Sequence, residues 1–330
     1  MKFRNIILSA VMSVVMLGSC SSTQKTSETA VTSESTTTQS VVFDADSAYS
    51  FVKAQFDFGA RVPNTEAHRR CGDYLVAKLQ GYGANVIVQE PVLTAYDGTK
   101  LNARNIIGEF APDATRRLLL LAHWDCRPWA DCDPDPKNHR KPVMGANDGA
   151  SGVGVLLEIA RLLQQRLPNV GVDILFVDAE DWGDSEGVSA SPDDSWALGT
   201  QYWTANPHRI GYRPMFAILL DMVGARGSVF SREYFSMHYA PAVVNEVWKV
   251  AARSGYGSYF VNRDGGAITD DHVFVNRAGI PAIDIIAMDP TSENGFFPQW
   301  HTIDDTMQHI DQATLKAVGQ TLANLIYSLE

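Results

Sequence analysis

The sequence predicts a single α/β domain whose mostly parallel, mixed central sheet is covered by helices on both faces. Solidly apolar runs of strand length alternate along the chain with segments whose apolar residues recur at helical spacing. This alternation is typical of a sheet that is buried on both sides. After about residue 43 the sequence shows no internal repeat and no second linker. One domain over residues 43–330 is therefore expected.

The expected elements follow from this alternation. Residues 117–122 form a leucine-rich run that suits a strand buried on both faces. Residues 152–165 place apolar side chains three and four positions apart, as on one face of a helix. By the same criteria, helices are expected at 69–80, 152–165, 242–253 and 312–329, and strands at 105–109, 117–122, 172–177, 216–220 and 281–286.

Composition and charge exclude some classes of partner. Of the 330 residues, 45% are hydrophobic, which is enough to fill a substantial core. The formal net charge is −11, and the chain contains no long run of lysine or arginine. We therefore expect neither a nucleic acid nor an anionic lipid surface as a partner.

The N-terminus reads as a targeting segment. Lys2 and Arg4 precede an apolar run over residues 6–17, which is short for a membrane span and suits an export signal. The segment Leu17-Gly18-Ser19-Cys20 resembles the bacterial lipobox, in which the cysteine is lipidated and becomes the new N-terminus. The alternative is an ordinary signal peptide with a chance cysteine. We expect a signal peptide over 1–19 and a lipidated Cys20.

The next residues predict a tether. Residues 20–42 are rich in serine and threonine and contain few large apolar side chains, so they cannot offset the entropy of ordering. Ser21 is not an aspartate, and resemblance to lipoprotein sorting signals then implies the outer membrane. We expect a periplasmic monomer that meets the membrane only through its lipid anchor.

Three further cysteines bear on the redox state. Cys71, Cys126 and Cys132 follow the tether, and export would permit disulfides. Cys126 and Cys132 share a loop and are the better candidate pair. Three free thiols remain the alternative.

Polar residues follow several of the expected strands. His123, Asp178 to Asp181 and Asp221 each come directly after an apolar run, and the strand at 281–286 leads into a loop that reaches His301. A small-residue turn around Asp148 precedes the helix at 152–165. Because parallel sheets bind ligands beyond the carboxyl ends of their strands, these residues predict a site at one sheet edge.

This chemistry favours zinc. Zn²⁺ accepts carboxylate and imidazole ligands together, and catalytic sites use three protein ligands with one open position. Asp148, Asp181 and His301 would supply two carboxylates and one imidazole. The adjacent Glu180 and Asp181 can divide their roles, so that one binds metal while the other moves protons.

At these residues the sequence resembles zinc aminopeptidases and the related glutaminyl cyclases. The resemblance covers nearly the whole domain, and the segments around Asp270 and Trp300 look most like the glutaminyl cyclases. It implies zinc ligands at Asp148, Asp181 and His301. The segments that carry it are Asn147-Asp148-Gly149-Ala150-Ser151-Gly152, Glu180-Asp181, Asp221, Thr269-Asp270-Asp271-His272 and Trp300-His301-Thr302-Ile303-Asp304-Asp305.

The same resemblance implies roles for the other site residues. Glu180 matches the general acid/base, and Asp221 and Asp270 match two acids of a hydrogen-bond network. Trp300 matches a wall of the substrate pocket, and Phe297 is expected to be another. One departure concerns the metal-binding acid of the adjacent pair, which is commonly Glu in the family and is Asp181 here. His272 is expected to support the loop of Asp270.

We therefore expect a glutaminyl-peptide cyclotransferase with one zinc per chain, acting on peptides and proteins with N-terminal glutamine. The first alternative is a zinc aminopeptidase, in which His123 and Asp221 would hold a second zinc bridged by Asp148. Otherwise His123 is a supporting residue. The second alternative is a non-catalytic surface lipoprotein that kept the fold. Trp182 and Trp196 are further candidates for the pocket wall.

Overall fold

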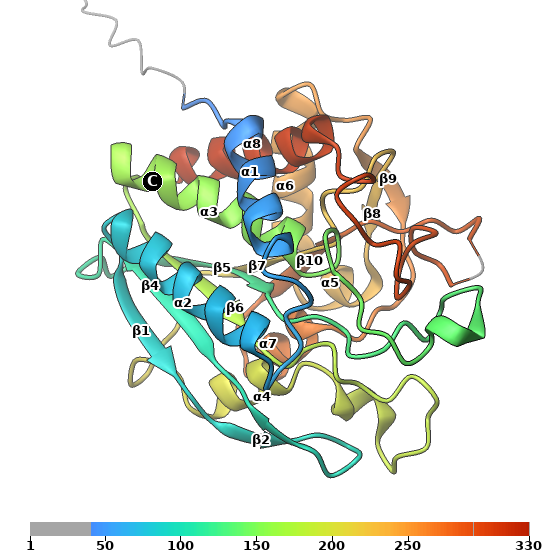
Figure 1. Cartoon of the computed structure of the whole chain (residues 1–330). Helices are drawn as coiled ribbons and strands as arrows, with labels where there is room; N and C mark the ends of the chain where they lie inside the picture. Colours follow the sequence, from blue (N-terminus) through green and yellow to red (C-terminus); the bar gives the residue numbers. More distant parts are fainter. Residues whose placement is uncertain (1–40, 293, 330) are drawn as a thin grey trace, which may run out of the picture. The chain divides into compact units, whose positions relative to one another are not determined.

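A computed structural model describes residues 41–292 and 294–329 of the chain (Figure 1). Its centre is a six-stranded sheet in the order β1-β4-β6-β5-β7-β10. The first two strands run antiparallel to their neighbours, and the other four are parallel to one another. The strands are β1 (Asn85–Gln89), β4 (Asn105–Phe110), β5 (Arg117–His123), β6 (Gly171–Val177), β7 (Ala217–Asp221) and β10 (Ala282–Ile286).

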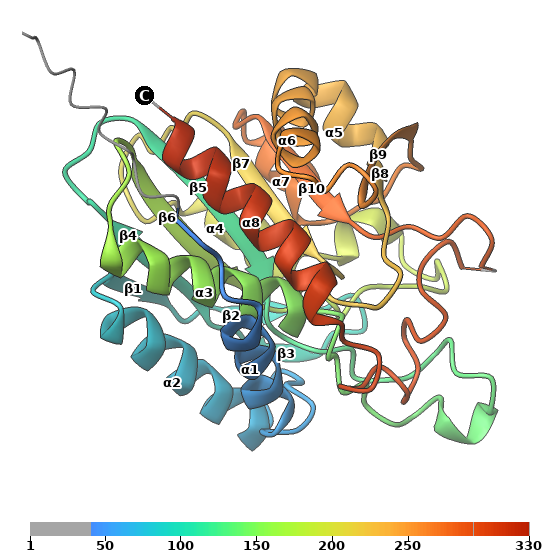
Figure 2. The same ribbon diagram turned by 90° about the horizontal axis from the view of Figure 1, so that it is seen from above.

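Helices cover both faces of this sheet, as the sequence predicts. One face carries the larger apolar core, and α1, α3 and α8 lie together over the strands (Figure 2). The other face packs against Trp203 of α4 and Val275 of α7. The helices are α1 (Ala45–Phe56), α2 (Glu66–Gly81), α3 (Ala150–Gln165), α4 (Leu198–Ala205), α5 (Tyr234–Tyr239), α6 (Pro241–Arg253), α7 (Asp271–Arg277) and α8 (Gln312–Ser328).

Two small sheets complete the fold: β2 (Val92–Thr94) pairs with β3 (Lys100–Asn102), and β8 (Phe230–Arg232) pairs with β9 (Phe260–Asp264). Within the described ranges, no helix is long and apolar enough to cross a membrane. The expected signal peptide, Cys20 and nearly all of the tether lie outside the described residues.

The five expected strands and four expected helices are present, with shifted ends. The helix expected at 69–80 begins at Glu66, because the Thr65 side chain accepts a hydrogen bond from the backbone N–H of His68 and caps it. The antiparallel edge strand β1 was not predicted from the sequence. Neither was α1, whose Phe51 and Val52 are buried in the core.

The candidate disulfide between Cys126 and Cys132 is absent, so that expectation was wrong. Cys71, Cys126 and Cys132 are free thiols. The Cys126 side chain is buried and lies 3.5 Å from the carbonyl oxygen of Met144, whereas Cys132 is exposed. Because the two side chains occupy opposite environments of the same loop, proximity in sequence does not bring them together.

A glycine contact joins α3 to the sheet. Gly152, in the first turn of α3, comes so close to β7 that an added Cβ would lie 2.2 Å from the carbonyl oxygen of Leu220 and 3.0 Å from the Cβ of Ala122. Backbone atoms cannot move aside as a flexible side chain can. This contact fixes the start of α3, and therefore Asp148 just before it, against the strand that ends in Asp221.

Gly152→Ala should consequently destabilise the fold by at least about 2 kcal/mol, because the new methyl group overpacks a backbone contact. The measurement is urea unfolding, with Gly81→Ala as the matched control. Gly81 ends α2, and its added Cβ meets nothing within 4 Å, so that variant should be unchanged or up to about 1 kcal/mol more stable. Equal stability of the two variants would contradict this contact.

Candidate active site

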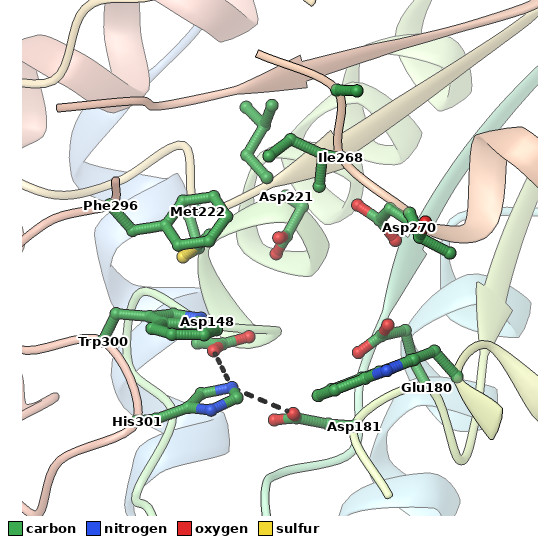
Figure 3. Close-up of a pocket in the computed structure, with 14 residues that line it drawn as sticks. Asp148, Glu180, Asp181, Asp221, Met222, Ile268, Asp270, Phe296, Trp300 and His301 are labelled. Atoms are coloured by element: carbon green, nitrogen blue, oxygen red, sulfur yellow. Dashed lines mark ion pairs between the residues drawn. The ribbon is translucent and has the colours of Figure 1, made fainter. Parts of the chain in front are cut away.

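The carboxyl ends of the parallel strands gather the predicted site residues at one edge of the sheet. His123 ends β5 and Asp221 ends β7, while Glu180 and Asp181 follow β6. A cavity of about 220 Å³ opens there (Figure 3). It is lined by Asp148, Glu180, Asp181, Trp196, Asp221, Met222, Ala267, Ile268, Thr269, Asp270, Ile286, Phe296, Trp300 and His301.

Three of these residues form the expected metal-binding trio. The His301 Nε2 atom lies 3.2 Å from Asp181 Oδ1 and 3.6 Å from Asp148 Oδ2 (Figure 3). One ligand atom from each residue lies within 4.8 Å of the other two, and all three side chains are buried. Two carboxylate oxygens and one imidazole nitrogen fit a zinc ion.

Buried carboxylates hold the backbone of these ligands in place. Asp125 accepts hydrogen bonds from the N–H groups of Glu180 and Asp181, both at 3.2 Å. Asp305 accepts from the N–H groups of Asn147 at 2.8 Å and Asp148 at 3.0 Å. Asp125 follows an expected strand together with the other metal-competent residues, but its contact with the backbone of Glu180 and Asp181 could not be predicted from the sequence.

Strained backbone also marks the site. His301, Ala179 and Met222 have φ values of 53°, 53° and 48°, in the left-handed region that non-glycine residues rarely adopt. Ala179 precedes Glu180, and Met222 follows Asp221. Such strain persists only where surrounding contacts fix it, and it re-aims the neighbouring side chains into the cavity.

A second trio shares Asp148 with the first. The His123 Nε2 atom lies 3.0 Å from Asp148 Oδ1 and 3.2 Å from Asp221 Oδ1. One ligand atom from each of these residues also lies within 4.8 Å of the other two. The arrangement fits either a protonated imidazole between two carboxylates or a second cation in contact with all three side chains.

Burial shifts the pKa values of the remaining acids upward. It raises the pKa of Asp221 to about 7, and the nearby negative charge of Asp148 adds to this effect. Burial also raises the pKa of Asp270, and it raises that of Glu180 well above the usual 4.5. Like charges this close cannot all remain ionised, so some of these acids hold protons near neutral pH.

The two acids of the first trio differ. Burial and the neighbouring Asp148 raise the pKa of Asp181 to about 6. Burial acts in the same direction on Asp148, but the hydrogen bond and charge of His123 outweigh it and lower the pKa of Asp148. Asp148 is therefore the carboxylate that stays ionised most readily, which suits its place in both trios.

Aromatic side chains form the walls of the cavity. The Trp300 ring stacks on His301 with centroids 3.7 Å apart, and Phe296 lies against Trp300 at 4.7 Å. Phe297, expected in the wall, is buried in the apolar cluster behind it, and Phe296 takes the lining position instead. Trp196 also lines the cavity. The sequence placed an aromatic pair here but could not say which ring faces inward.

Behind Asp270, His272 has the supporting place expected for it. Its Nε2 atom lies 3.1 Å from Glu233 Oε2. Glu233 also accepts hydrogen bonds from the N–H groups of Phe235 and Ser236. Burial opposes ionisation, but these bonds and His272 lower the pKa of Glu233 to about 2. An ionised carboxylate thus fixes the start of α7, where Asp270 caps the helix.

Several known proteins are similar to this chain. The family model of peptidase family M28 matches residues 105–326. A glutaminyl cyclase of Bacteroides thetaiotaomicron, solved with N-acetylhistamine bound, is 56% identical over 88% of this chain and 99% of its own, with a TM-score of 0.85. A Zn-dependent exopeptidase of Parabacteroides distasonis is 55% identical over 87% of this chain and 99% of its own, with a TM-score of 0.86.

The chain is also similar to a more distant cyclotransferase. The glutaminyl-peptide cyclotransferase of Gloydius blomhoffii is 25% identical, and the match spans 79% of this chain and 75% of that protein.

The raised pKa of Asp221 predicts how stability depends on pH. With a pKa of about 7 in the folded metal-free protein against an ordinary 3.8, Asp221 holds a proton that the unfolded chain releases. Its contribution to stability is complete below about pH 4 and is lost as the pH rises to about 7, by about 1.4 kcal/mol for each unit.

Asp221→Asn should remove this loss of folding stability at rising pH. Chemical unfolding of the two chelator-treated proteins at several pH values measures it. Because the variant has no proton to lose at this position, it should gain stability relative to wild type as the pH rises from about 4 to about 7. A difference that does not change with pH would contradict a buried, protonated Asp221.

Proposed function

The chain belongs to peptidase family M28, and we propose that it is a zinc-dependent glutaminyl-peptide cyclotransferase with one zinc per chain. It converts the N-terminal glutamine of peptides and proteins into pyroglutamate and releases ammonia. The observation that carries this proposal is the cavity itself, in which Trp300, Phe296 and Trp196 enclose both the metal-binding trio and the proton-holding acids. The 56% identical glutaminyl cyclase supports it.

The reaction needs the substrate to react with itself. The N-terminal amine attacks the side-chain amide carbon, a ring C–N bond forms, and the bond to the departing ammonia breaks. Zinc held by Asp148, Asp181 and His301 would polarise the amide carbonyl and stabilise the negative charge on its oxygen. No water takes part, so the aromatic walls that exclude water favour cyclisation over hydrolysis.

Glu180 is the proposed acid/base. Its carboxyl lines the cavity, and its raised pKa lets it accept a proton from the amine near neutral pH and return one to the leaving ammonia. Asp221 and Asp270 line the same cavity, and their raised pKa values allow them to share protons with Glu180. The walls of Trp300 and Phe296 hold the glutamine side chain folded toward its own amine.

A zinc aminopeptidase is the second candidate, and one observation favours it. His123 and Asp221 form the second trio with Asp148, which is the donor set that a second zinc would need. Two metals would activate a water for peptide hydrolysis, and Asp221 would then be an ionised ligand. The similarity to the Zn-dependent exopeptidase of Parabacteroides distasonis also supports this candidate.

The product formed decides between the two reactions. We expect the purified protein to release ammonia from a peptide that begins with glutamine and to leave a pyroglutamyl peptide. We expect no arylamine from leucyl-arylamide, because hydrolysis needs an activated water. Release of a free amino acid from either substrate would overturn the proposal, and mass spectrometry of the products distinguishes these outcomes.

Two variants of the adjacent acids complete this test. Glu180→Gln should lower kcat by about 10²-fold or more, as expected for loss of a general acid/base, and should keep its zinc. Asp181→Asn should lose zinc. Loss of zinc from the Glu180 variant instead would show that the two roles are reversed.

We further propose that Cys20 is lipidated and anchors the enzyme in the outer membrane, with the catalytic domain in the periplasm. The support is the sequence Leu17-Gly18-Ser19-Cys20 and the serine- and threonine-rich residues after it. Cys20→Ser should move the protein from the membrane fraction to the soluble periplasmic fraction on cell fractionation. A wild-type protein found only in the soluble fraction would contradict the anchor.

A further inference from the structure

The guanidinium group of Arg127 lies beside the site and is completely buried. All of its N–H groups donate. The Nε atom and Nη2 donate to Asp131 at 3.2 and 2.7 Å, and Nη2 also donates to the Ser185 hydroxyl at 3.0 Å. Nη1 donates to the carbonyl oxygens of Asp181 and Gly183, both at 3.0 Å. Five donors with five acceptors fix the orientation of this group.

Two of the residues that accept these hydrogen bonds are part of the metal-binding trio or in contact with it, namely Asp181 and Asp131. Asp181 is a member, and its backbone carbonyl is held by Arg127. Asp131 contacts the other ring nitrogen of His301, with Nδ1 and Oδ1 3.2 Å apart. A carboxylate beside this nitrogen favours the tautomer and the ring orientation that leave Nε2 free to bind a metal. Arg127 therefore supports two of the three proposed ligands at once.

The same guanidinium group lies over two tryptophan rings. Its central carbon lies 4.9 Å from the ring centroid of Trp129 and 4.8 Å from that of Trp196. Trp129 is half-buried and does not line the cavity, whereas Trp196 does. A planar cation against an aromatic face contributes about 0.5–2 kcal/mol when shielded from water.

The stack continues through the metal-binding histidine. Trp196 and His301 have nearly parallel rings, 21° apart, with centroids separated by 6.3 Å. The Trp300 ring also stacks on His301, with ring centroids 3.7 Å apart. Figure 3 shows these two rings next to each other. The cavity walls and the imidazole ligand thus belong to one column that runs from Trp129 through Arg127, Trp196 and His301 to Trp300.

We propose that Arg127 is a positioning residue that makes zinc retention and substrate affinity depend on the same side chain. Through Asp131 and the backbone of Asp181 it orients the zinc ligands, and through Trp196 it holds one wall of the substrate cavity. The part that concerns the substrate rests on the proposed function, and the part that concerns zinc does not. Lysine cannot replace it, because an ammonium group has neither the fork nor the flat faces.

A simpler explanation is that Arg127 stabilises the fold as any buried arginine would. The chain offers a matched control in Arg117, which begins β5 at the opposite edge of the sheet from the site. Arg117 is also buried, and its Nε donates to Asp173 at 2.7 Å. Its Nη2 atom also donates to Asp173, at 2.5 Å, and the remaining N–H groups donate to backbone carbonyls such as that of Ala111. Arg117→Lys removes a comparable fork from the core without touching the site.

The test compares Arg127→Lys with Arg117→Lys in three measurements: the zinc Kd by competition with a chelator, the KM for a peptide with N-terminal glutamine, and the Tm. We expect Arg127→Lys to raise the zinc Kd about tenfold or more and to raise KM several-fold. Arg117→Lys should lower the Tm and leave both other values at wild type.

Two variants of Trp129 provide a second test if Arg127→Lys fails to fold. Trp129→Leu removes one face of the column without touching the cavity, and it should raise both the zinc Kd and KM. Trp129→Phe keeps an aromatic face and should restore both.

Three results would overturn the proposal. The first is a wild-type zinc Kd and a wild-type KM in Arg127→Lys or Trp129→Leu. The second is a change in the zinc Kd without a change in KM, or the reverse. The third is a change in both quantities in Arg117→Lys that equals the change in Arg127→Lys. If the wild-type protein does not cyclise glutamine, the proposed function fails, while the zinc Kd still tests the role of Arg127.

Discussion

The burial of several carboxyl groups at one edge of the sheet is the constraint on which the rest of the site depends. Asp148, Glu180, Asp181, Asp221 and Asp270 share a cavity with little access to water. A buried carboxyl group is stable only when it is ionised beside a cation or a hydrogen-bond donor, or when it holds a proton and is neutral. The structure offers all three, and the way in which they are distributed decides the chemistry.

Each part of the site answers this constraint differently. Backbone N–H groups donate to the supporting carboxyl groups of Asp125 and Asp305, while His301 and Arg127 lower the pKa of Asp131 against the opposing effect of burial. The trio that includes Asp181 is left to a divalent cation. The acids that remain, Glu180, Asp221 and Asp270, share protons among themselves, as their raised pKa values indicate. A site with one cation and shared protons suits the transfer of protons within one substrate molecule better than the activation of water.

Much of this arrangement could be predicted from the sequence, because it depends on local patterns. A short run of leucines between turns predicts a buried strand, and parallel strands bring their carboxyl ends together, so His123, Asp181 and Asp221 were expected to lie close together. Contacts between distant loops have no such pattern. Arg127 is one arginine in a loop rich in Asp, Pro and Trp, and nothing in the sequence shows that Trp129 and Trp196 both lie against it.

The same limit explains the errors. Neither the choice between Phe296 and Phe297 nor the separation of Cys126 from Cys132 follows from spacing, because both depend on how a loop turns. The edge strand β1 was missed although Val86, Ile87 and Val88 are β-branched residues that favour a strand.

The central claim is that one zinc, rather than two, shares this edge with proton-holding acids. Anomalous diffraction at the zinc absorption edge, on crystals of the zinc-saturated protein, tests it most directly. The account predicts one peak, in contact with Asp148, Asp181 and His301. A second peak of similar height between His123 and Asp221 would contradict it, because Asp221 would then be a metal ligand and could not hold a proton.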